Sequence, residues 1–516
     1  MSEQVSWVES LAEVYGSGTG SDVPPEYEER FKSLIKSFSK LYGNKPDFVS
    51  RSPGRVNIIG EHVDYSLYNV LPTAVTNDVM IAVQVVQDDA VERKLTISNV
   101  NHTKYPSQEY LIPQSGKVTV DIKDHKWSNY FLAGVSGSLD FLQRKHGSGF
   151  VPKSMKVLVD GSVPAGGGLS SSAAFVCASA LAAFAANGEQ VSKQDLLDEC
   201  IVSERSVGVF SGGMDQAASI FSQRGFLLYC RFWPEFSAEH VPVPQADSEF
   251  TFLIAQSFVT SDKAVTAPIH YNLRVVEVTL AAVVLAKLHD IVLKPDNSSL
   301  HFCLRNFQEQ ITKKLGRKDG PVEEQVQLVA EIIKSKLDRD SYTREDIAGI
   351  LKVSVESLEK EYLSQFLIRA DSFKLRQRAL HVLEEAQRVL KFRKILSSTG
   401  SSSLDQEGLV QLGELMNQTQ QSCRDIFECS CPEVDDICVI ARKAGAYGSR
   451  LTGAGWGGCT VHLVAQADVE AVTSALKEHY YYKKFPDISN ETLKDAIVIS
   501  KPGQGSSVIY GKALDV

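Results

Sequence analysis

The run Pro164–Ala174 has the residue types that most clearly suggest chemistry. It contains three glycines and then three serines, ahead of a long apolar stretch: Gly166, Gly167, Gly168, Ser170, Ser171 and Ser172. Glycines let a backbone approach a ligand closely, and we expect the serines to cap the helix that follows. The N–H groups and positive end of such a helix bind anions. The run therefore predicts a phosphate site rather than a flexible linker. It is not a P-loop, because no GxxxxGK[ST] string occurs in the sequence.

A second cluster of polar residues lies in Gly54–Tyr65, around a short apolar strand. Arg55 precedes the strand, and Glu61, His62 and Asp64 come directly after it. Several hydrogen-bond acceptors and a donor so close together suit a ligand with many hydroxyl groups. Taken alone, the cluster is more typical of a solvated turn, and it lacks the HExxH spacing of a helical zinc site.

Two further motifs are weaker signals. Asp215 follows two glycines in Ser211–Gln216 and could act as a general base or cap a helix. Glu204, upstream of it, is a candidate magnesium ligand but could equally be a surface acid. The glycine-rich run Leu451–Cys459 leads into a strand and by itself could be a hairpin corner.

The composition is that of an ordinary globular protein. Of 516 residues, 43% are hydrophobic and 23% are charged, and the formal net charge is −9. These values exclude a wholly disordered chain and argue against a nucleic-acid-binding protein. Nine cysteines without a CxxC pair do not predict a disulfide framework. We interpret the closest set as reduced structural cysteines rather than a zinc site: Cys423, Cys429, Cys431 and Cys438.

No segment predicts a membrane anchor. The polar start Met1–Gln4 differs from a signal peptide. The longest nearly apolar run, Ala173–Ala186, is too short to span a bilayer and predicts a buried helix. We therefore expect a cytoplasmic protein without a membrane partner.

The pattern of elements predicts two α+β domains after a mobile tail of residues 1–25. β-branched runs between Gly, Pro, Asn and Asp predict strands at 56–59, 79–86, 95–97, 118–120, 155–159, 459–464 and 496–500. Apolar residues three to four apart predict helices near 31–38, 274–293 and 371–390. We interpret the Lys and Arg residues of the last helix as a solvated face. The charged segment 295–360 predicts short helices without evident chemistry.

Together and in this order, the motifs resemble those of the galactokinases, within the GHMP kinase superfamily. Gly54–Tyr65 resembles the galactokinase signature, Gly167–Ala174 the ATP loop of the superfamily, and Thr452–Cys459 its third motif. The resemblance extends from about residue 26 to the end of the sequence. The length, the motif wording and the insertion around 295–360 are most similar to the yeast-type galactokinases.

The resemblance implies an α+β, two-domain GHMP kinase fold with the active site in the cleft between the domains. Residues 26–225 would form a ribosomal-protein-S5-like domain, and residues 226–516 a ferredoxin-like domain with the helical insertion at about 295–360. The implied reaction transfers the γ-phosphate of ATP to the anomeric hydroxyl of α-D-galactose, giving galactose 1-phosphate and ADP. ATP is the implied cosubstrate, and Mg²⁺ the implied metal.

The resemblance also implies roles for single residues. Asp215 matches the catalytic aspartate, which could accept the proton of the anomeric hydroxyl. Arg55 matches its partner arginine, which could keep Asp215 ionised and neutralise charge on the transferred phosphoryl group. Besides these two, the residues implied to bind sugar hydroxyls are Glu61, His62, Asp64, Gly212 and Tyr271.

The remaining implied residues bind the nucleotide and its metal. ATP would contact Gly166, Gly167, Gly168, Leu169, Ser170, Ser171, Ser172, Ala173, Trp127 and Asn129. Ser172 and Glu204 would hold Mg²⁺, with Ser171 as the next candidate. Trp127 matches an aromatic residue that contacts adenine, although it could also belong to the core. We expect His270 to be structural.

Two alternatives stay open at this point. Yeast-type galactokinases include sensors that bind galactose and ATP and then relieve a transcriptional repressor, with little catalysis. The uninterrupted run Ser170–Ala174, together with Arg55 and Asp215, favours an active kinase. The chain could also do both jobs, with a nuclear as well as a cytoplasmic location. The other alternative is an N-acetylgalactosamine kinase, which would differ in pocket width around the 2-position of the sugar. From family habit we expect a monomer.

Overall fold

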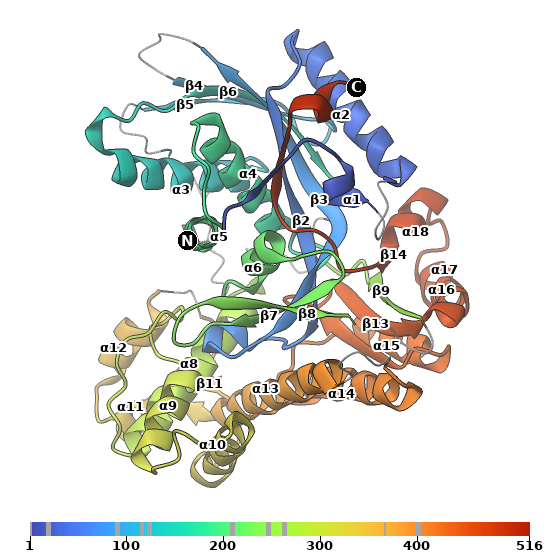
Figure 1. The fold of residues 1–516 in the computed structure, drawn as a ribbon. Helices are drawn as coiled ribbons and strands as arrows, with labels where there is room; N and C mark the ends of the chain where they lie inside the picture. Colours follow the sequence, from blue (N-terminus) through green and yellow to red (C-terminus); the bar gives the residue numbers. More distant parts are fainter. Residues whose placement is uncertain are drawn as a thin grey trace.

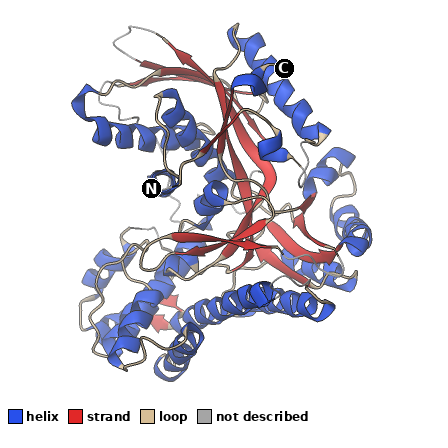
Figure 2. Ribbon diagram, viewed as in Figure 1, coloured by secondary structure: helices blue, strands red, loops and turns tan. Residues whose placement is uncertain are grey.

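The computed structural model describes residues 3–16, 22–87, 93–113, 118, 120, 126–164, 166–206, 212–243, 249–260, 266–365, 368–398 and 404–516. Two larger sheets with their covering helices, two two-stranded sheets and a separate group of helices make up this part of the chain (Figure 1 and Figure 2). The predicted α+β fold is confirmed. No helix in the described part of the chain is both long and apolar enough to cross a membrane.

A seven-stranded sheet forms the core of the N-terminal half. In sheet order its strands are β1 (Ser6–Val8), β15 (Ser507–Tyr510), β2 (Phe48–Ile59), β3 (Leu71–Val86), β6 (Ser154–Gly161), β4 (Arg93–Asn99) and β5 (Gln108–Ile112). The interior strand β2 pairs antiparallel with the central strand β3 and is buried along its whole length. It is buried because helices cover both faces of the sheet.

The helices on the two faces of the sheet differ in how much of their surface is apolar. On one face lies α4 (Ser171–Ala186), with α3 (Asn129–His146) and α5 (Lys193–Ser206) packed against it. α4 is apolar on every side because it is surrounded by the sheet and these helices. On the other face lies α2 (Pro25–Tyr42), which buries only one apolar stripe. The stripe consists of Phe31, Leu34, Ile35 and Phe38.

The second sheet is antiparallel and has four strands. In sheet order they are β12 (Gly448–Thr452), β13 (Cys459–Ala465), β9 (Phe250–Gln256) and β14 (Ile497–Ser500). Its outer face is covered by α15 (Pro432–Lys443), α16 (Val469–Leu476) and α18 (Asn490–Ala496), with the short α17 (Tyr482–Lys484) between the last two. A hairpin of β7 (Phe226–Arg231) and β8 (Ser237–Pro242) packs on β3.

Three long helices pack one on the next, and the first two flank the insertion in the chain. They are α8 (Tyr271–Leu288), α13 (Leu375–Ser398) and α14 (Gln406–Asp425). The insertion contains α9 (Leu304–Lys314), α10 (Val322–Lys336), α11 (Arg344–Leu351) and α12 (Val355–Leu358), and β10 (Tyr342–Thr343) pairs with β11 (Ser372–Phe373). α10 packs against α13, and α9 and α11 pack against α8. In Figure 1 the insertion lies at the lower left, and α13 runs from it along the bottom of the molecule.

Four expectations differ from the structure. Part of the expected mobile tail is ordered, because β1 pairs with β15 and the short helix α1 (Ala12–Tyr15) follows it. The same strand β15 returns the chain end to the first sheet, so a division at residue 225 does not separate the two sheets. The basic residues of α13 are not all solvated, since Arg378 and Arg388 are buried beside carboxylates. Of the expected strand 118–120, Thr119 lies outside the described residues, and the flanking Val118 and Val120 are in no strand.

A buried ionic cluster attaches both ends of the chain to the first sheet. Asp78, on β3, accepts hydrogen bonds from Arg30 and Arg51, each at 2.6 Å. It also accepts one from the Tyr15 hydroxyl at 2.6 Å. Arg51, which is 1% exposed, donates in addition to the carbonyl of Gln504. Burial alone would raise the pKa of Asp78, but the charges of Arg30 and Arg51 lower it below its ordinary value.

We predict that Asp78→Asn lowers the free energy of unfolding by about 3–5 kcal/mol, because Arg51 would stay buried without its counter-charge. Asp160→Asn is the matched control, since it removes only the second, more exposed partner of Arg30. It should cost about 1 kcal/mol or less. Urea unfolding of both variants measures the difference, and equal losses would contradict the role given to Asp78.

Candidate active site

Arg55 and Asp215 form a buried ion pair where β2 meets α6 (Met214–Phe221). The Nε and Nη2 atoms of Arg55 lie 2.8 and 2.7 Å from Oδ1 of Asp215. The Arg55 side chain is 3% exposed and that of Asp215 is 14% exposed. Burial lowers the pKa of Arg55, but the charges of Asp215 and Glu61 outweigh this effect and raise it. The structure thus places these two predicted site residues in direct contact.

The glycine–serine run is joined directly to this pair. The Ser170 hydroxyl donates to Oδ2 of Asp215 at 2.5 Å, and Nη1 of Arg55 donates to the carbonyl of Gly168 at 2.7 Å. Ser170 occupies the cap position of α4, but its side chain makes no cap hydrogen bond within the described residues. The prediction of side-chain capping was therefore wrong for Ser170, because its hydroxyl bonds to Asp215 instead.

The third glycine-rich motif packs against the glycine–serine run. A Cβ on Gly168 would lie 2.8 Å from the carbonyl oxygen of Thr452, and one on Gly453 would lie 2.5 Å from the carbonyl oxygen of Gly168. Real Cβ atoms do not approach backbone so closely, so only glycine fits at both positions. The two runs, nearly 300 residues apart in the chain, thus form one surface beside Arg55.

Ser172 and Glu204 are in contact beside the start of α4. The Ser172 hydroxyl donates to Oε1 of Glu204 at 2.7 Å, and Gln216 donates to Oε2 at 2.5 Å. Glu204 is 1% exposed, which excludes the surface acid that its sequence also allowed. Among the described residues, no group of three or more His, Cys, Asp or Glu side chains is arranged to hold a metal ion.

The predicted sugar-binding residues follow the end of β2 and are buried. Glu61 forms an ion pair with Arg450 of β12, which also donates to the carbonyl of Asn57 at 2.7 Å. Burial raises the pKa of Glu61, although the charge of Arg450 acts in the opposite direction. The two ring nitrogens of His62 lie 3.1 Å from the Tyr65 hydroxyl and 3.1 Å from the carbonyl oxygen of Ala454.

Asp64, Gly212 and Tyr271 complete this cluster. Oδ2 of Asp64 accepts a hydrogen bond from the backbone of Met214 at 3.4 Å. A Cβ on Gly212 would lie 2.5 Å from the same oxygen and 2.5 Å from the backbone nitrogen of Tyr65, so this position requires glycine. The ring of Tyr271, at the start of α8, lies 5.5 Å from that of His62. Predicted site residues from the end of β2, the glycine–serine run, the segment before α6 and the start of α8 therefore lie together around Arg55 and Asp215.

Trp127 lies beside the first turns of α4. Its ring stacks on Phe175 at 6.1 Å with an interplanar angle of 3°, and its Nε1 donates to the carbonyl of Pro106 at 3.1 Å. The side chain is only partly buried, and Asn129 begins α3 two residues later. His270, expected to be structural, stacks on Trp456 at 4.5 Å.

Three buried polar residues of this region were not identified from the sequence: His381, Glu385 and Arg450. Arg450 lies in the buried strand β12, directly before the third glycine-rich motif. This position is the one sequence feature that could have indicated a role for it. His381 and Glu385 fall beside Val382 and Ala386 on the apolar face of α13. A polar residue on an apolar helix face indicates a buried hydrogen-bond partner, because burial of an unpaired polar group is unfavourable.

Three models of protein families match segments of the chain. The galactokinase galactose-binding signature matches residues 36–85, the GHMP kinases N terminal domain residues 129–223, and the GHMP kinases C terminal domain residues 402–481. The galactokinase of Saccharomyces cerevisiae is 41% identical over 95% of this chain and 96% of its own length. That of Schizosaccharomyces pombe is 38% identical over 94% and 96%. The chain belongs to the galactokinases of the GHMP kinase superfamily.

The fold of this galactokinase is also that of a solved relative. The crystal structure of Lactococcus lactis galactokinase, complexed with galactose, has a TM-score of 0.66 and 22% sequence identity to it. The match covers 92% of this chain and 99% of the other. The predicted family, the two-domain GHMP kinase fold and the ATP-dependent sugar kinase activity are thus confirmed.

Burial and the neighbouring charge of Asp215 raise the pKa of Asp64 to about 6. Its carboxylate therefore takes up a proton, and loses its charge as an acceptor, when the pH falls through about 6. We predict that kcat/KM for galactose declines as the pH is lowered from about 7.5 to about 5. Asp64→Asn should remove this step, because the amide does not titrate. Steady-state kinetics across this range measure both profiles, and a step that survives in the variant would contradict the assignment.

Proposed function

We propose that galactose phosphorylation in this enzyme occurs at the Arg55–Asp215 pair, with Asp215 accepting the proton of the anomeric hydroxyl. The observation that carries the proposal is that Arg55 contacts both Asp215 and the carbonyl of Gly168. A single side chain thereby fixes the proposed proton acceptor relative to the glycine–serine run. The Ser170 hydroxyl, bonded to the other oxygen of Asp215, adds a second fixed contact.

The acceptor sugar would lie among the buried polar groups next to this pair. Its hydroxyls would be held by Glu61, His62, Asp64, Gly212 and Tyr271, together with Arg55 and Asp215. Phosphoryl transfer depends mainly on positioning and electrostatic stabilisation. The ion pairs and hydrogen bonds that fix these side chains before the sugar binds support this mechanism. An epimer that leaves one of the buried groups unpaired would be rejected.

The nucleotide would lie along the start of α4. The backbone and hydroxyl groups of Gly166–Ala173 would bind the phosphates, since the first N–H groups of a helix have no partner within it. Trp127 and Asn129 would lie next to the adenine base of the nucleotide. Ser172 and Glu204 fit Mg²⁺ as adjacent oxygen donors beside this phosphate site, with Ser171 as the next candidate. Bound there, the ion would neutralise charge on the phosphates.

We predict that Asp215→Asn lowers kcat by about 10²–10⁴-fold, because the amide cannot take up the proton of the anomeric hydroxyl. The amide has nearly the same shape, so galactose should still bind. Galactose-dependent release of ADP from Mg-ATP measures the rate, with glucose and N-acetylgalactosamine as acceptor controls. Calorimetric titration with galactose measures binding.

Arg55→Lys is the companion variant. Lysine keeps the charge but cannot contact Asp215 and Gly168 in the same fork geometry, so kcat should fall by about tenfold or more.

If Asp215→Asn retained wild-type kcat, the role proposed for Asp215 would be wrong. If it lost both turnover and galactose binding, Asp215 would be a binding residue only.

Three narrower sequence predictions stay predictions. They are a galactose- and ATP-dependent contact with a transcriptional repressor, a monomeric state, and a cytoplasmic location with a nuclear fraction. The repressor contact requires that galactose and ATP together favour one closed state of the protein. Failure of the repressor to bind when both ligands are present would refute it.

A further inference from the structure

The loop that follows β2 is held from outside its own domain. We call residues Gly60–Tyr68 the sugar loop, because they include Glu61, His62 and Asp64. The backbone N–H groups of Gly60 and Glu61 both donate to Oε1 of Glu385, at 2.8 and 3.1 Å. Nε2 of His381 lies 3.0 Å from the carbonyl oxygen of Glu61. Three backbone groups of two consecutive residues thus face α13.

Glu385 is itself rigidly placed. Its side chain is completely buried, and its second oxygen, Oε2, accepts hydrogen bonds from Arg388 at 2.7 Å and Thr419 at 2.8 Å. Burial raises the pKa of Glu385, but the neighbouring positive charge of Arg388 outweighs this and lowers it to about 2. The carboxylate is therefore a charged acceptor at neutral pH. Such acceptors make stronger hydrogen bonds to N–H groups than neutral ones do.

The sugar loop needs external support because of its backbone conformation. His62 and Leu67 have φ values of 59° and 62°, in the left-handed region that side chains disfavour. Gly60 has a φ of 107°, and a Cβ there would lie 3.0 Å from Val70. A conformation of this kind persists only when surrounding contacts impose it. The direction of the His62 side chain, next to the proposed acceptor site, depends on that conformation.

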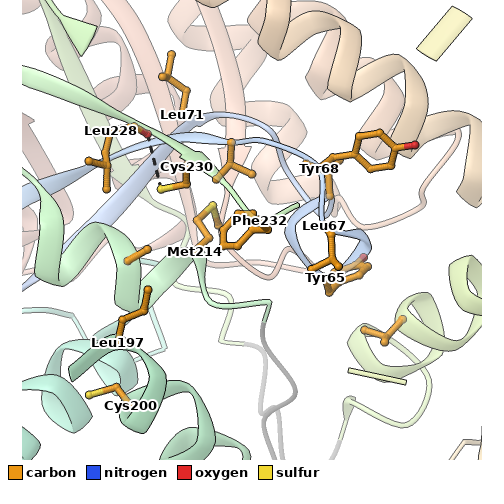
Figure 3. Packing of buried hydrophobic residues seen from close by; sticks show 14 of the residues in the cluster. Tyr65, Leu67, Tyr68, Leu71, Leu197, Cys200, Met214, Leu228, Cys230 and Phe232 are labelled. Atoms are coloured by element: carbon orange, nitrogen blue, oxygen red, sulfur yellow. Dashed lines mark hydrogen bonds between the residues drawn. The ribbon is translucent and has the colours of Figure 1, made fainter. Parts of the chain in front are cut away.

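The far end of the sugar loop is attached to the helical insertion. The Tyr68 hydroxyl donates to Oε1 of Gln308 at 2.8 Å, and Gln308, on α9, is completely buried. Figure 3 shows the Tyr68 ring extending away from Met214 and Phe232, with its hydroxyl group at the tip. The insertion, for which the sequence suggested no chemistry, therefore contacts the loop that carries the predicted sugar-binding residues.

We propose that Glu385 and Gln308 are positioning residues for galactose, holding the two ends of the sugar loop. The inference rests on the proposed role of Glu61, His62 and Asp64 in binding the sugar. A buried carboxylate adds little net stability compared with apolar packing, so its presence is better explained by the loop geometry that it imposes. α10 of the insertion packs on the helix that carries Glu385, and α9 supplies Gln308. The insertion is thereby part of the acceptor site's support.

Glu385→Gln tests the first contact. The amide keeps the size of the side chain but lacks the charge, and its NH₂ group must face either Arg388 or the two loop N–H groups. We expect KM for galactose to rise by at least about tenfold, with KM for ATP within about twofold and kcat less affected than KM. Glu384→Gln is the matched control on the same helix, since its carboxylate is 38% exposed and its partner Lys334 lies at 3.7 Å. It should leave all three parameters unchanged.

Two milder variants keep the test decisive if Glu385→Gln folds poorly. Thr419→Val removes one donor to Glu385 with little change in shape, and Tyr68→Phe removes only the hydroxyl that contacts Gln308. Each should raise KM for galactose by about threefold or more and leave KM for ATP unchanged. A purely structural role would change both constants together, or the melting temperature alone.

Asp64→Ala separates failure of this inference from failure of the proposed site. If Asp64→Ala raises KM for galactose, while the Glu385, Thr419 and Tyr68 variants do not, the positioning role is overturned and the sugar site stands. If Asp64→Ala also leaves KM for galactose unchanged, the proposed sugar site is wrong, and the positioning role falls with it. Equal rises in KM for galactose and ATP in the Glu385 variant would likewise overturn the positioning role.

Discussion

The arrangement of this galactokinase depends on one buried guanidinium group. Arg55 is nearly inaccessible to water, so its charge and its N–H groups must be satisfied within the protein. Asp215 and the Gly168 carbonyl satisfy them, which fixes β2, α6 and the glycine–serine run relative to one another. The contact of Gly168 with Thr452 and Gly453 then joins the second sheet to the same point.

The proposed sugar site extends this principle to both halves of the chain. The residues of the sugar loop follow a strand of the first sheet, yet their partners come from C-terminal elements: Arg450 from β12, Glu385 from α13 and Gln308 from the insertion. Each partner is buried, and each satisfies a group that would otherwise be isolated from water. We therefore expect substitutions in these C-terminal elements, far from the sugar loop in sequence, to affect binding of the sugar.

The sequence predicted the parts of this architecture that are local. Glycine-rich runs, β-branched runs and apolar periodicity are properties of short segments, and the strands near 56–59, 79–86, 155–159 and 459–464 were found in this way. The pairing of β1 with β15 could not be found, because each is short and forms only with a partner about 500 residues away. Likewise, the bond from Ser170 to Asp215 depends on tertiary contact, whereas the sequence pattern favoured a local cap. The partners of the sugar loop were not predicted for the same reason, although the position of His381 and Glu385 on the apolar face of α13 could have indicated them.

A crystal structure with galactose, Mg²⁺ and a non-hydrolysable ATP analogue tests the central claim most directly. The account predicts that the anomeric oxygen lies within about 3 Å of an Asp215 carboxylate oxygen, with the γ-phosphate between it and Gly166–Ala173. The remaining sugar hydroxyls should face Glu61, His62 and Asp64. A sugar bound with its anomeric oxygen directed away from Asp215, or without contact to the sugar loop, would contradict it.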